Sequence, residues 1–346
     1  MTELKNASPV PRLLSVLILV CNLLHQEKSC LEMSNVKFQT KHTAADASTA
    51  ATLGVRMVDA SIVVTSYNHG PYIAQCLASI LEQTTERRLE IVWYDDASTD
   101  DTIARGEEVL QNCPHEIIRI HQSNNRMQRK IPFMLDQIER CRGEFVFMTE
   151  GDDFWIDPRK IDAQIDALIV HPEIKLCFTP ANVYSADSSN PLGVLARHSN
   201  EQTIFSLDTV IAGDGGFMPT NSLCIRRDVF NTAPDWLYEY LPVGDYPMQV
   251  LSSAPNGALF LPQVTCGYRQ NVQGSWTTSV FNVPSKRIHF EISFLELLIK
   301  LHKTLPGHKD AFFKLIKFHS TALFKLSVDA EDYSQLPRLV AVMNSI

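Results

Sequence analysis

Apolar runs alternate with amphipathic stretches from Ala60 onward, and this alternation predicts strands and helices in turn. The run SIVVTSYN, which begins at Ser61, predicts a strand that enters a loop. The apolar positions that follow have helical spacing and predict one buried helix stripe: Ile73, Cys76, Leu77, Ile80 and Leu81.

The same alternation continues through four more predicted strands: LEIVWY, HEIIRI, EFVFMT and KLCFTP. Between them, Ser98 and Asp101 have the spacing of a capping box for a helix that runs through Val109. Further helices are predicted over 131–141 and 158–171. The second of these has one apolar face: Ile161, Ile165, Leu168 and Ile169.

This order of elements predicts an α/β fold with a mainly parallel sheet and helices on both of its faces. We expect three segments: an N-terminal extension over 1–58, the α/β domain over 59–284, and a helical segment over 285–346. The extension ends in a Thr-, Ala- and Ser-rich linker. The last segment has the stripe Ile288, Ile292, Leu295 and Ile299, and then a second helix around 312–326.

Composition narrows the class of protein. The 346 residues are 45% apolar, which is enough for a sizeable core, and the formal net charge is −8. This charge argues against a nucleic-acid partner, which requires a basic face. The eight cysteines are scattered and include no C-x-x-C pair, as expected for reduced, buried thiols in a cytoplasmic protein.

Two segments raise the question of membrane contact. The apolar run Leu13–Leu24 has 12 residues, whereas ~17–25 are needed to span a bilayer. It is followed by HQEKSC rather than a small-residue cleavage site, so a packed or membrane-surface helix is favoured over a secretory signal. Lysines on the C-terminal helices suggest peripheral contact with the inner membrane face, as the alternative to packing on the domain: Lys300, Lys303, Lys314 and Lys317.

Polar residues gather where the predicted strands end. In a parallel sheet these ends share one edge, where ligands bind, so loops from three strands are expected to meet there. The residues are Tyr67 and Asn68 after the first strand, Asp95 and Asp96 after the second, and Glu150, Asp152 and Asp153 after the fourth.

The segment FVFMTEGDDFWIDPRK places three carboxylates within four positions at a strand end. Adjacent carboxylates repel one another, so burying them is costly unless a cation compensates. Mg²⁺ or Mn²⁺ does so through one or two carboxylates together with diphosphate oxygens. The alternative is an exposed acidic turn that caps the helix after Pro158.

Two more acids are candidates for substrate chemistry. Asp96 follows a strand directly, and its carboxylate can accept hydrogen bonds from a base N–H or from ribose hydroxyls. The alternative is a helix N-terminus that favours acids, which Asp100 and Asp101 fit better. Asp245, in LPVGDYPM, is the best candidate for a general base outside the metal cluster, with a helix N-cap as the alternative.

Four segments, in this order, resemble the inverting family 2 glycosyltransferases with the GT-A fold: SIVVTSYNHGPYIAQCLASILEQ, YDDASTDDT, EGDDFWIDPRKI and GDYP. The resemblance covers about 61–279 and is nearest to a bacterial subgroup whose metal motif reads E-G-D-D, an aromatic residue and Trp. It implies transfer of a sugar, a hexose or a related one, from a nucleotide diphosphate to a hydroxyl acceptor, with Mn²⁺ or Mg²⁺ as cofactor.

The resemblance also implies roles for individual residues. Tyr67, with Asn68 beside it, and Asp96 would contact the nucleotide base, whereas Asp152 would lie near the ribose or the sugar. Asp153 would bind the metal, with Asp152 as a second candidate ligand, and Asp245 would be the general base. This chain departs from the family pattern at two positions, because Gly244 stands where many members have Glu and Glu150 stands where Asp is frequent.

The segment YRQNVQGSW resembles the family's loop over the active site. There, Trp276 would close on the sugar and Arg269 would offset diphosphate charge. The segment differs from the Q-x-x-R-W of processive synthases, so transfer of single sugars is favoured. The resemblance suggests a lipid-linked or cell-surface polysaccharide acceptor, as in bacterial lipopolysaccharide or capsule assembly.

Two other functions stay open at this stage. A non-catalytic nucleotide-sugar-binding protein on the same fold would have the same residue types. A sugar-nucleotide pyrophosphorylase is expected to have a glycine-rich basic loop after the first strand, where this chain has TSYNHGPY. Walker A, G-x-G-x-x-G and H-E-x-x-H motifs are absent from the sequence.

Overall fold

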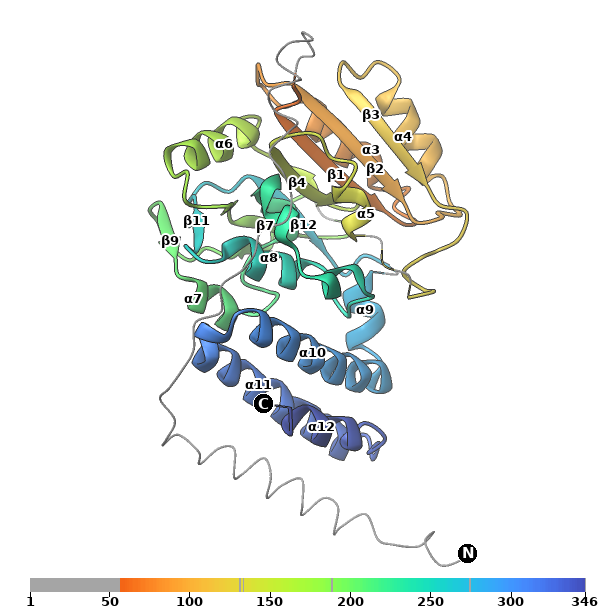
Figure 1. Cartoon of the computed structure of the whole chain (residues 1–346). Coiled ribbons are helices and arrows are strands. Elements are labelled where there is room, and N and C mark those ends of the chain that lie inside the picture. The colour runs from red at the N-terminus through yellow and green to blue at the C-terminus, as the bar shows by residue number, and fades with distance from the viewer. Residues whose placement is uncertain (1–56, 131, 133, 188, 274, 346) are drawn as a thin grey trace, which may run out of the picture.

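The structure is a computed structural model that describes residues 57–130, 132, 134–187, 189–273 and 275–345. The predicted N-terminal helix Leu13–Leu24 and the linker after it lie outside the described residues. Figure 1 shows an α/β domain with the C-terminal helices stacked against one side of it.

Four parallel strands form one half of the main sheet, in the spatial order β3-β2-β1-β4. They are β1 (Ala60–Ser66), β2 (Leu89–Asp95), β3 (Glu116–His121) and β4 (Phe145–Glu150). Successive side chains of a strand point to opposite faces. Ile62 and Val64 accordingly enter one core while Val63 enters the other. Burial on both faces explains the nearly continuous apolar runs of β1, β2 and β4.

Mixed pairing completes the sheet beyond β4, in the order β10-β6-β11-β9. Strand β10 is antiparallel to both of its neighbours, β11 is parallel to β6, and β9 is antiparallel to β11. The bounds are β6 (Leu176–Phe178), β9 (Thr203–Phe205), β10 (Cys224–Arg226) and β11 (Ala258–Phe260). The predicted α/β class with a mainly parallel sheet is therefore confirmed.

Four short strands form a second sheet, in the order β5-β12-β7-β8. Its strands are β5 (Phe154–Trp155), β7 (Ala181–Ser185), β8 (Gly193–Leu195) and β12 (Cys266–Gln270). Because β5 immediately follows the E-G-D-D turn and pairs with β12, this sheet brings the 266–270 segment beside that turn.

Helices cover both faces of the main sheet. Residues of α3 (Ile73–Leu81) and α6 (Lys160–Val170) belong to the core on one face. Those of α5 (Met134–Ile138), α7 (Leu207–Ala212) and α8 (Asp245–Ser253) belong to the core on the other. The remaining helices of the domain are α4 (Thr102–Leu110), α9 (Trp276–Phe281), η1 (Thr220–Ser222), η2 (Arg227–Thr232) and η3 (Asp235–Tyr238).

Three local predictions differ from the structure. Ile169 was expected on the buried face of its helix but is 54% exposed, since it lies in the last turn of α6. The helix expected over 131–141 is assigned only over Met134–Ile138. The Ser98–Asp101 capping box is wrong, because Asp101 itself is the N-cap residue of α4, without a side-chain cap bond, and the Ser98 hydroxyl donates to Asp95. Thr102 N donates to Asp100 Oδ1 instead.

The C-terminal helices pack on the α/β domain and share its core. They are α10 (Pro284–Thr304), η4 (Pro306–His308), α11 (Lys309–Asp329) and α12 (Leu336–Met343). The predicted stripe of α10 is buried, and the ring of Phe294 lies 5.3 Å from that of Tyr246 on α8. These helices are therefore an integral layer of the molecule, as Figure 1 shows.

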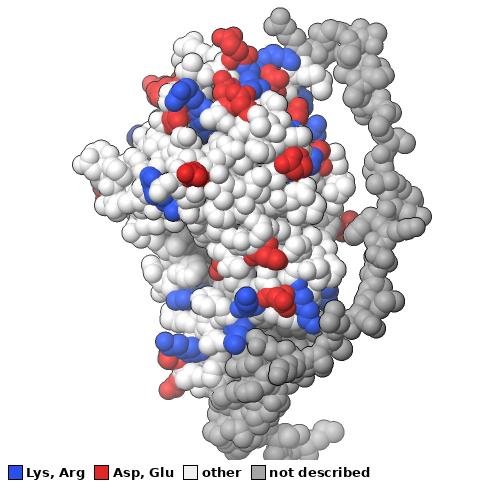
Figure 2. All heavy atoms as spheres, turned by 90° about the vertical axis from the view of Figure 1, so that its left-hand side faces the viewer, with Lys and Arg blue, Asp and Glu red and all other residues white. Residues whose placement is uncertain are grey.

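The surface carries charges of both signs (Figure 2), and the cysteines of the described residues are free thiols. On the face drawn in Figure 2, basic and acidic side chains are interspersed toward both ends with a largely uncharged band between them. Six cysteines in the described part of the chain are free thiols, and five of them are buried. Among the residues that the structure describes, no helix combines the length and apolar character that crossing a membrane requires.

Candidate active site

Three loops meet at the carboxyl ends of β1, β2 and β4. Within the sheet, Ser66 is paired with Asp95, and Thr65 with Glu150. The pairing extends one residue beyond the strands, because Asp96 N donates to Ser66 O at 2.8 Å and Gly151 N donates to Thr65 O at 2.8 Å. The parallel register thus brings these predicted site segments together.

Gly151 lets the E-G-D-D turn pass close to the first loop. A Cβ at this position would lie 2.9 Å from His69 Nδ1, 3.0 Å from Ile73 Cδ1 and 3.1 Å from Ser66 Cβ. Contacts this short are tighter than packed carbon atoms accept. The glycine therefore fixes how near the carboxylates of Asp152 and Asp153 come to β1.

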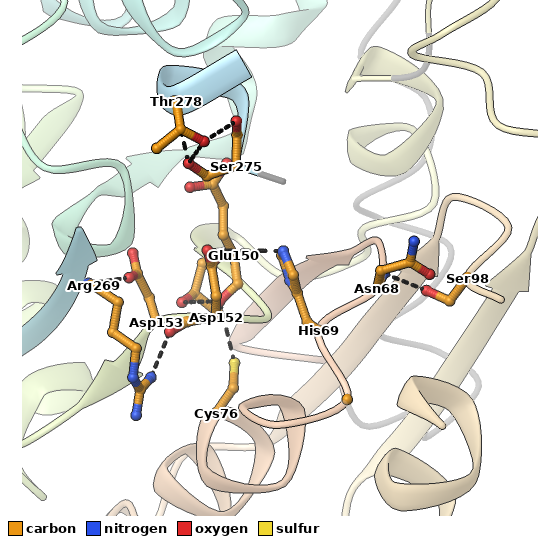
Figure 3. A network of polar contacts seen from close by, with 12 residues as sticks. Asn68, His69, Cys76, Ser98, Glu150, Asp152, Asp153, Arg269, Ser275 and Thr278 are labelled. Carbon is orange, nitrogen blue, oxygen red and sulfur yellow. Dashed lines mark hydrogen bonds and ion pairs between the residues drawn. The ribbon is translucent and has the colours of Figure 1, made fainter. Parts of the chain in front are cut away.

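The carboxylates of Asp152 and Asp153 lie between His69 on one side and Arg269 on the other (Figure 3). Asp152 Oδ2 is 3.8 Å from His69 Nε2. Asp153 is 1% exposed, and its Oδ1 accepts a hydrogen bond from Arg269 N at 2.8 Å. Its other oxygen, Oδ2, is buried without a hydrogen-bond partner among the described residues. A buried carboxylate oxygen with no partner is costly and fits a site for a cation.

Arg269 was expected to offset diphosphate charge, and the structure shows it bracing the turn. Its guanidinium donates to the carbonyl oxygen of Asp152 and to Gln75 Oε1. The same group lies 4.5 Å from the ring centre of Phe154 and 5.0 Å from that of Tyr72. Burial lowers the pKa of Arg269, but the nearby charges of Asp153 and Asp152 favour its cationic form.

Asp245 reaches the same region from the N-terminus of α8. Its Oδ1 accepts from Tyr246 N at 2.8 Å, and its Oδ2 accepts from Thr220 Oγ1 at 3.2 Å. Burial raises the pKa of Asp245 in spite of these two bonds. A base with a raised pKa is better matched to proton transfer near neutral pH.

Glu150, Asp152, Asp153 and Asp245 interact electrostatically, and we call these four residues the acidic cluster. The Glu150 side chain reaches solvent, yet surrounding protein raises its pKa to about 8, with further contributions from the charges of Asp152 and then Asp245. Burial, Asp152 and Glu150 raise the pKa of Asp153 well above its usual value. The Tyr268 hydroxyl has its pKa raised by burial and then by all four carboxylates.

The acidic cluster fits a divalent ion only together with a ligand. Within the described ranges, no three His, Cys, Asp or Glu side chains are arranged to hold a metal ion unaided. Mg²⁺ and Mn²⁺ sites of the nucleotide-dependent kind need only one or two carboxylates, because phosphate oxygens and water supply the other ligands. A cavity of about 630 Å³ beside α7 and α11 is lined by none of the four residues.

The expected base-binding residues hold a loop in place. Asp96 accepts from Arg126 N at 2.7 Å and from Met127 N at 3.0 Å, so both of its oxygens are engaged. The hydroxyl of Tyr67 accepts from Gln128 Nε2 at 3.4 Å in the same loop. This geometry makes the 125–130 segment, which Asp96 orders, part of the surroundings of Tyr67.

Asn68 and Asp95 connect the first two loops. Asn68 has a positive φ of 53°, and its Oδ1 accepts from Thr99 N at 2.8 Å. Asp95 was only one of the acids at the strand end, yet it accepts from Ser66 Oγ at 2.7 Å and from Ser98 Oγ at 2.6 Å. The structure thus gives both side chains a bracing role.

Three residues of this region had no sequence signal, because only the tertiary fold brings them there. Thr220 and His69 contact Asp245 and Asp152 of the acidic cluster. Gln75 accepts a hydrogen bond from Arg269. Trp276 begins α9, and its side chain lies outside the described part of the structure. Its expected closure on the sugar stays a prediction.

Residues 61–231 match the family model described as glycosyl transferase family 2. The uncharacterized protein Rv1520 of Mycobacterium tuberculosis (strain ATCC 25618 / H37Rv) is 30% identical over 218 residues, which are 62% of this chain and 60% of that protein. The matched part of this chain therefore spans less than two thirds of that relative.

Two solved structures share the fold. TarS of S. aureus, residues 1–349 in complex with UDP-GlcNAc, gives a TM-score of 0.57 at 16% identity over 82% of this chain and 79% of that chain. The mannosyltransferase PcManGT of Pyrobaculum calidifontis, in complex with GDP-Man and Mn²⁺, gives a TM-score of 0.50 at 12% identity over 97% of this chain and 88% of that chain. At such identities the likeness concerns the fold.

Proposed function

We propose that this chain transfers a sugar from a nucleotide diphosphate to a hydroxyl acceptor, because residues 61–231 match the glycosyl transferase family 2 model and the fold is similar to that of TarS. The observation that supports this most is the buried, unpartnered Asp153 Oδ2 within the acidic cluster. Four carboxylates beside the guanidinium of Arg269 leave an excess of negative charge, which fits a divalent ion that also binds a diphosphate. The two structural neighbours were solved with UDP-GlcNAc and with GDP-Man and Mn²⁺.

We assign the residues of this chain as follows. Asp153, with Asp152 beside it, would hold Mn²⁺ or Mg²⁺, and the ion would supply positive charge for the departing diphosphate. Asp245 accepts the proton of the acceptor hydroxyl, and its bonds from Thr220 Oγ1 and Tyr246 N fix the orientation of the carboxylate. Attack from the side opposite the departing group gives inversion at the sugar carbon.

Residues outside the acidic cluster would contact the nucleotide base of the donor, and the acceptor is proposed from the family resemblance. Tyr67 and the 125–130 loop ordered by Asp96 would surround the base. We propose single-sugar transfer to a lipid-linked or surface polysaccharide acceptor, on the strength of the family resemblance. The free cysteines of the described residues agree with a cytoplasmic location, and the lysines of α10 and α11 offer peripheral contact with the inner membrane.

The test compares Asp245→Asn with the unaltered protein across a panel of UDP-, GDP- and dTDP-sugars, with Mn²⁺ present. We expect hydrolysis of at least one donor by the unaltered protein and a loss of roughly 10²–10⁴-fold in kcat for the variant. Mn²⁺-dependent binding of UDP or GDP, measured by calorimetry, should persist in the variant. Asp235→Asn, at an exposed position in η3, is the matched control and should change neither quantity.

A different result would favour the rival function. If Mn²⁺ and nucleotide bind but no donor turns over in either protein, with acceptor extracts supplied, the chain is a non-catalytic nucleotide-sugar-binding protein. If Asp245→Asn retains full turnover while Asp235→Asn behaves identically, the assigned base is wrong.

A further inference from the structure

A histidine of the C-terminal helices is buried between two carboxylates. His319 on α11 is 5% exposed. Its Nδ1 lies 2.7 Å from Glu291 Oε2 on α10, and its Nε2 lies 3.1 Å from Asp214 Oδ2 in the turn after α7. The three side chains join the two C-terminal helices to the α/β domain.

The two contacts fix the charge of the ring. A neutral imidazole donates from only one nitrogen, whereas both nitrogens of His319 face carboxylate oxygens, so the imidazolium form satisfies the pair. Burial alone lowers the pKa of His319, but the hydrogen bonds that the ring donates to Asp214 and Glu291 outweigh it and raise the pKa to about 9. Arg287 is a further charged group nearby, and its Nε lies 3.9 Å from Glu291 Oε1.

Asp214 holds a tight turn that packs under the start of α8. Its backbone has a positive φ of 58°, and its Oδ1 accepts from Gly215 N at 2.6 Å. Tyr246 donates its hydroxyl to Ile211 O at 3.0 Å, and a Cβ at Gly215 would lie 3.9 Å from Tyr246 Cβ. The turn over 211–217 and the first residues of α8 are therefore in direct contact.

The Phe294 side chain on α10 contacts both His319 and Tyr246. Its ring lies 4.7 Å from that of His319 and 5.3 Å from that of Tyr246. Tyr246 directly follows Asp245, and the negative charge of Asp214 contributes to the raised pKa of Asp245. A continuous set of contacts thus runs from α11 to the proposed base.

We propose that His319 is a positioning residue, which holds the 211–217 turn against α8 through Asp214 and thereby sets the place of Asp245 in the acidic cluster. The C-terminal helices then belong to the catalytic unit. This inference rests on the proposed role of Asp245, but its structural half can be tested without any turnover.

The experiment uses the full chain and its variants His319→Gln and Asp214→Asn. The matched control is Arg338→Gln, which removes the Arg338–Glu296 pair between α12 and α10 and touches neither the turn nor α8. Backbone amide exchange is followed in peptides that cover 211–217 and 245–253. Donor hydrolysis gives kcat and KM for whichever sugar nucleotide the unaltered protein accepts.

Both variants should exchange these amides at least about tenfold faster, because the turn has lost its charged anchor. We expect kcat to fall roughly 10–100-fold with KM for the donor nearly unchanged, since small displacements of a base cost this much. Arg338→Gln should leave both peptides and kcat as they are. Asp214→Asn keeps the His319–Glu291 pair, so it reports on the turn even if His319→Gln does not fold.

Equal exchange in all variants, or equal acceleration in the control, would overturn the inference. So would a kcat in Asp214→Asn that matches the control while its 211–217 amides exchange faster. If the unaltered protein hydrolyses no donor, the proposed function fails, whereas the exchange data still decide whether His319 holds the turn.

Discussion

Two groups of acids in this chain differ in their balance of charge. The acidic cluster assembles four carboxylates, and Asp153 Oδ2 has no hydrogen-bond partner among the described residues. The His319 group contains two carboxylates on either side of one imidazole, and both ring nitrogens are engaged. Charge balance therefore distinguishes the two groups: four carboxylates meet in the acidic cluster, whereas an imidazole lies between the two carboxylates of the His319 group.

The largest expected effect comes from removing a charge of the acidic cluster with Asp153→Asn. Mn²⁺-dependent nucleotide binding and donor turnover should both be lost, the latter by more than about 10³-fold, because the ion has lost its main protein ligand. The metal-free protein should be no less stable in urea, since the substitution relieves repulsion from Asp152 and Glu150.

The reciprocal variant is Asp214→Asn, which is expected to lower the free energy of unfolding by about 1–2 kcal/mol, because solvent screens the 37% exposed Asp214 side chain, and to leave Mn²⁺-dependent nucleotide binding unchanged. If Asp153→Asn destabilises the metal-free protein as much as Asp214→Asn does, the two groups do not differ in their contribution to stability.

The second prediction concerns pH. The pKa of His319 is raised from 6.5 in the unfolded chain to about 9 in the folded one. Its contribution to stability is therefore complete below pH 6.5 and is lost as the pH rises through about 9. Urea unfolding should show the stability difference between the unaltered protein and His319→Gln shrinking over that interval by on the order of 3 kcal/mol.

The neighbours of His319 set the terms of that test. Asp214 and Glu291 face the two ring nitrogens of His319, and Arg287 faces Glu291 in turn. His308→Gln removes an exposed ion pair with Asp208 and serves as the control. A difference that stays constant from pH 6.5 to 10 means that the ring of His319 is not charged in the folded protein.

The two groups also differ in how far the sequence predicts them. The acids of the E-G-D-D turn follow a buried strand, and parallel pairing brings strand ends to one edge, so local pattern and one topological rule predicted their meeting. Asp245 joined them as the best acid outside the motif and by family resemblance. Its actual neighbours, such as Thr220, depend on packing that no spacing encodes.

The His319 group had no sequence signal of any kind. Its members lie on α10, on α11 and in the turn after α7, and each is a single polar residue in an otherwise ordinary stretch. The alternation of strands and helices predicted the α/β class, but the antiparallel place of β10 needed contacts between short strands distant in sequence. The start of α4 was also mispredicted, because Ser98 donates its hydroxyl to Asp95 and does not cap the helix.

The smallest expected effect is that of Gly151→Ala, which changes the geometry of the acidic cluster and none of its charges. The added Cβ would meet His69 Nδ1 at 2.9 Å and Ile73 Cδ1 at 3.0 Å, so the turn must shift by a few tenths of an ångström. We expect a loss of about 1–2 kcal/mol in stability and of roughly tenfold in kcat, because Asp152 and Asp153 move with the turn.

Gly307→Ala is the matched control, since a Cβ there has open space around it among the described atoms and should change neither stability nor kcat. Urea unfolding and donor hydrolysis, measured on both variants, separate the two outcomes. If Gly151→Ala loses stability but keeps full kcat, the acidic cluster tolerates movement of its turn, and charge alone distinguishes it from the His319 group. If kcat falls together with stability, the positions of the carboxylates matter in the acidic cluster, just as charge balance matters in the His319 group.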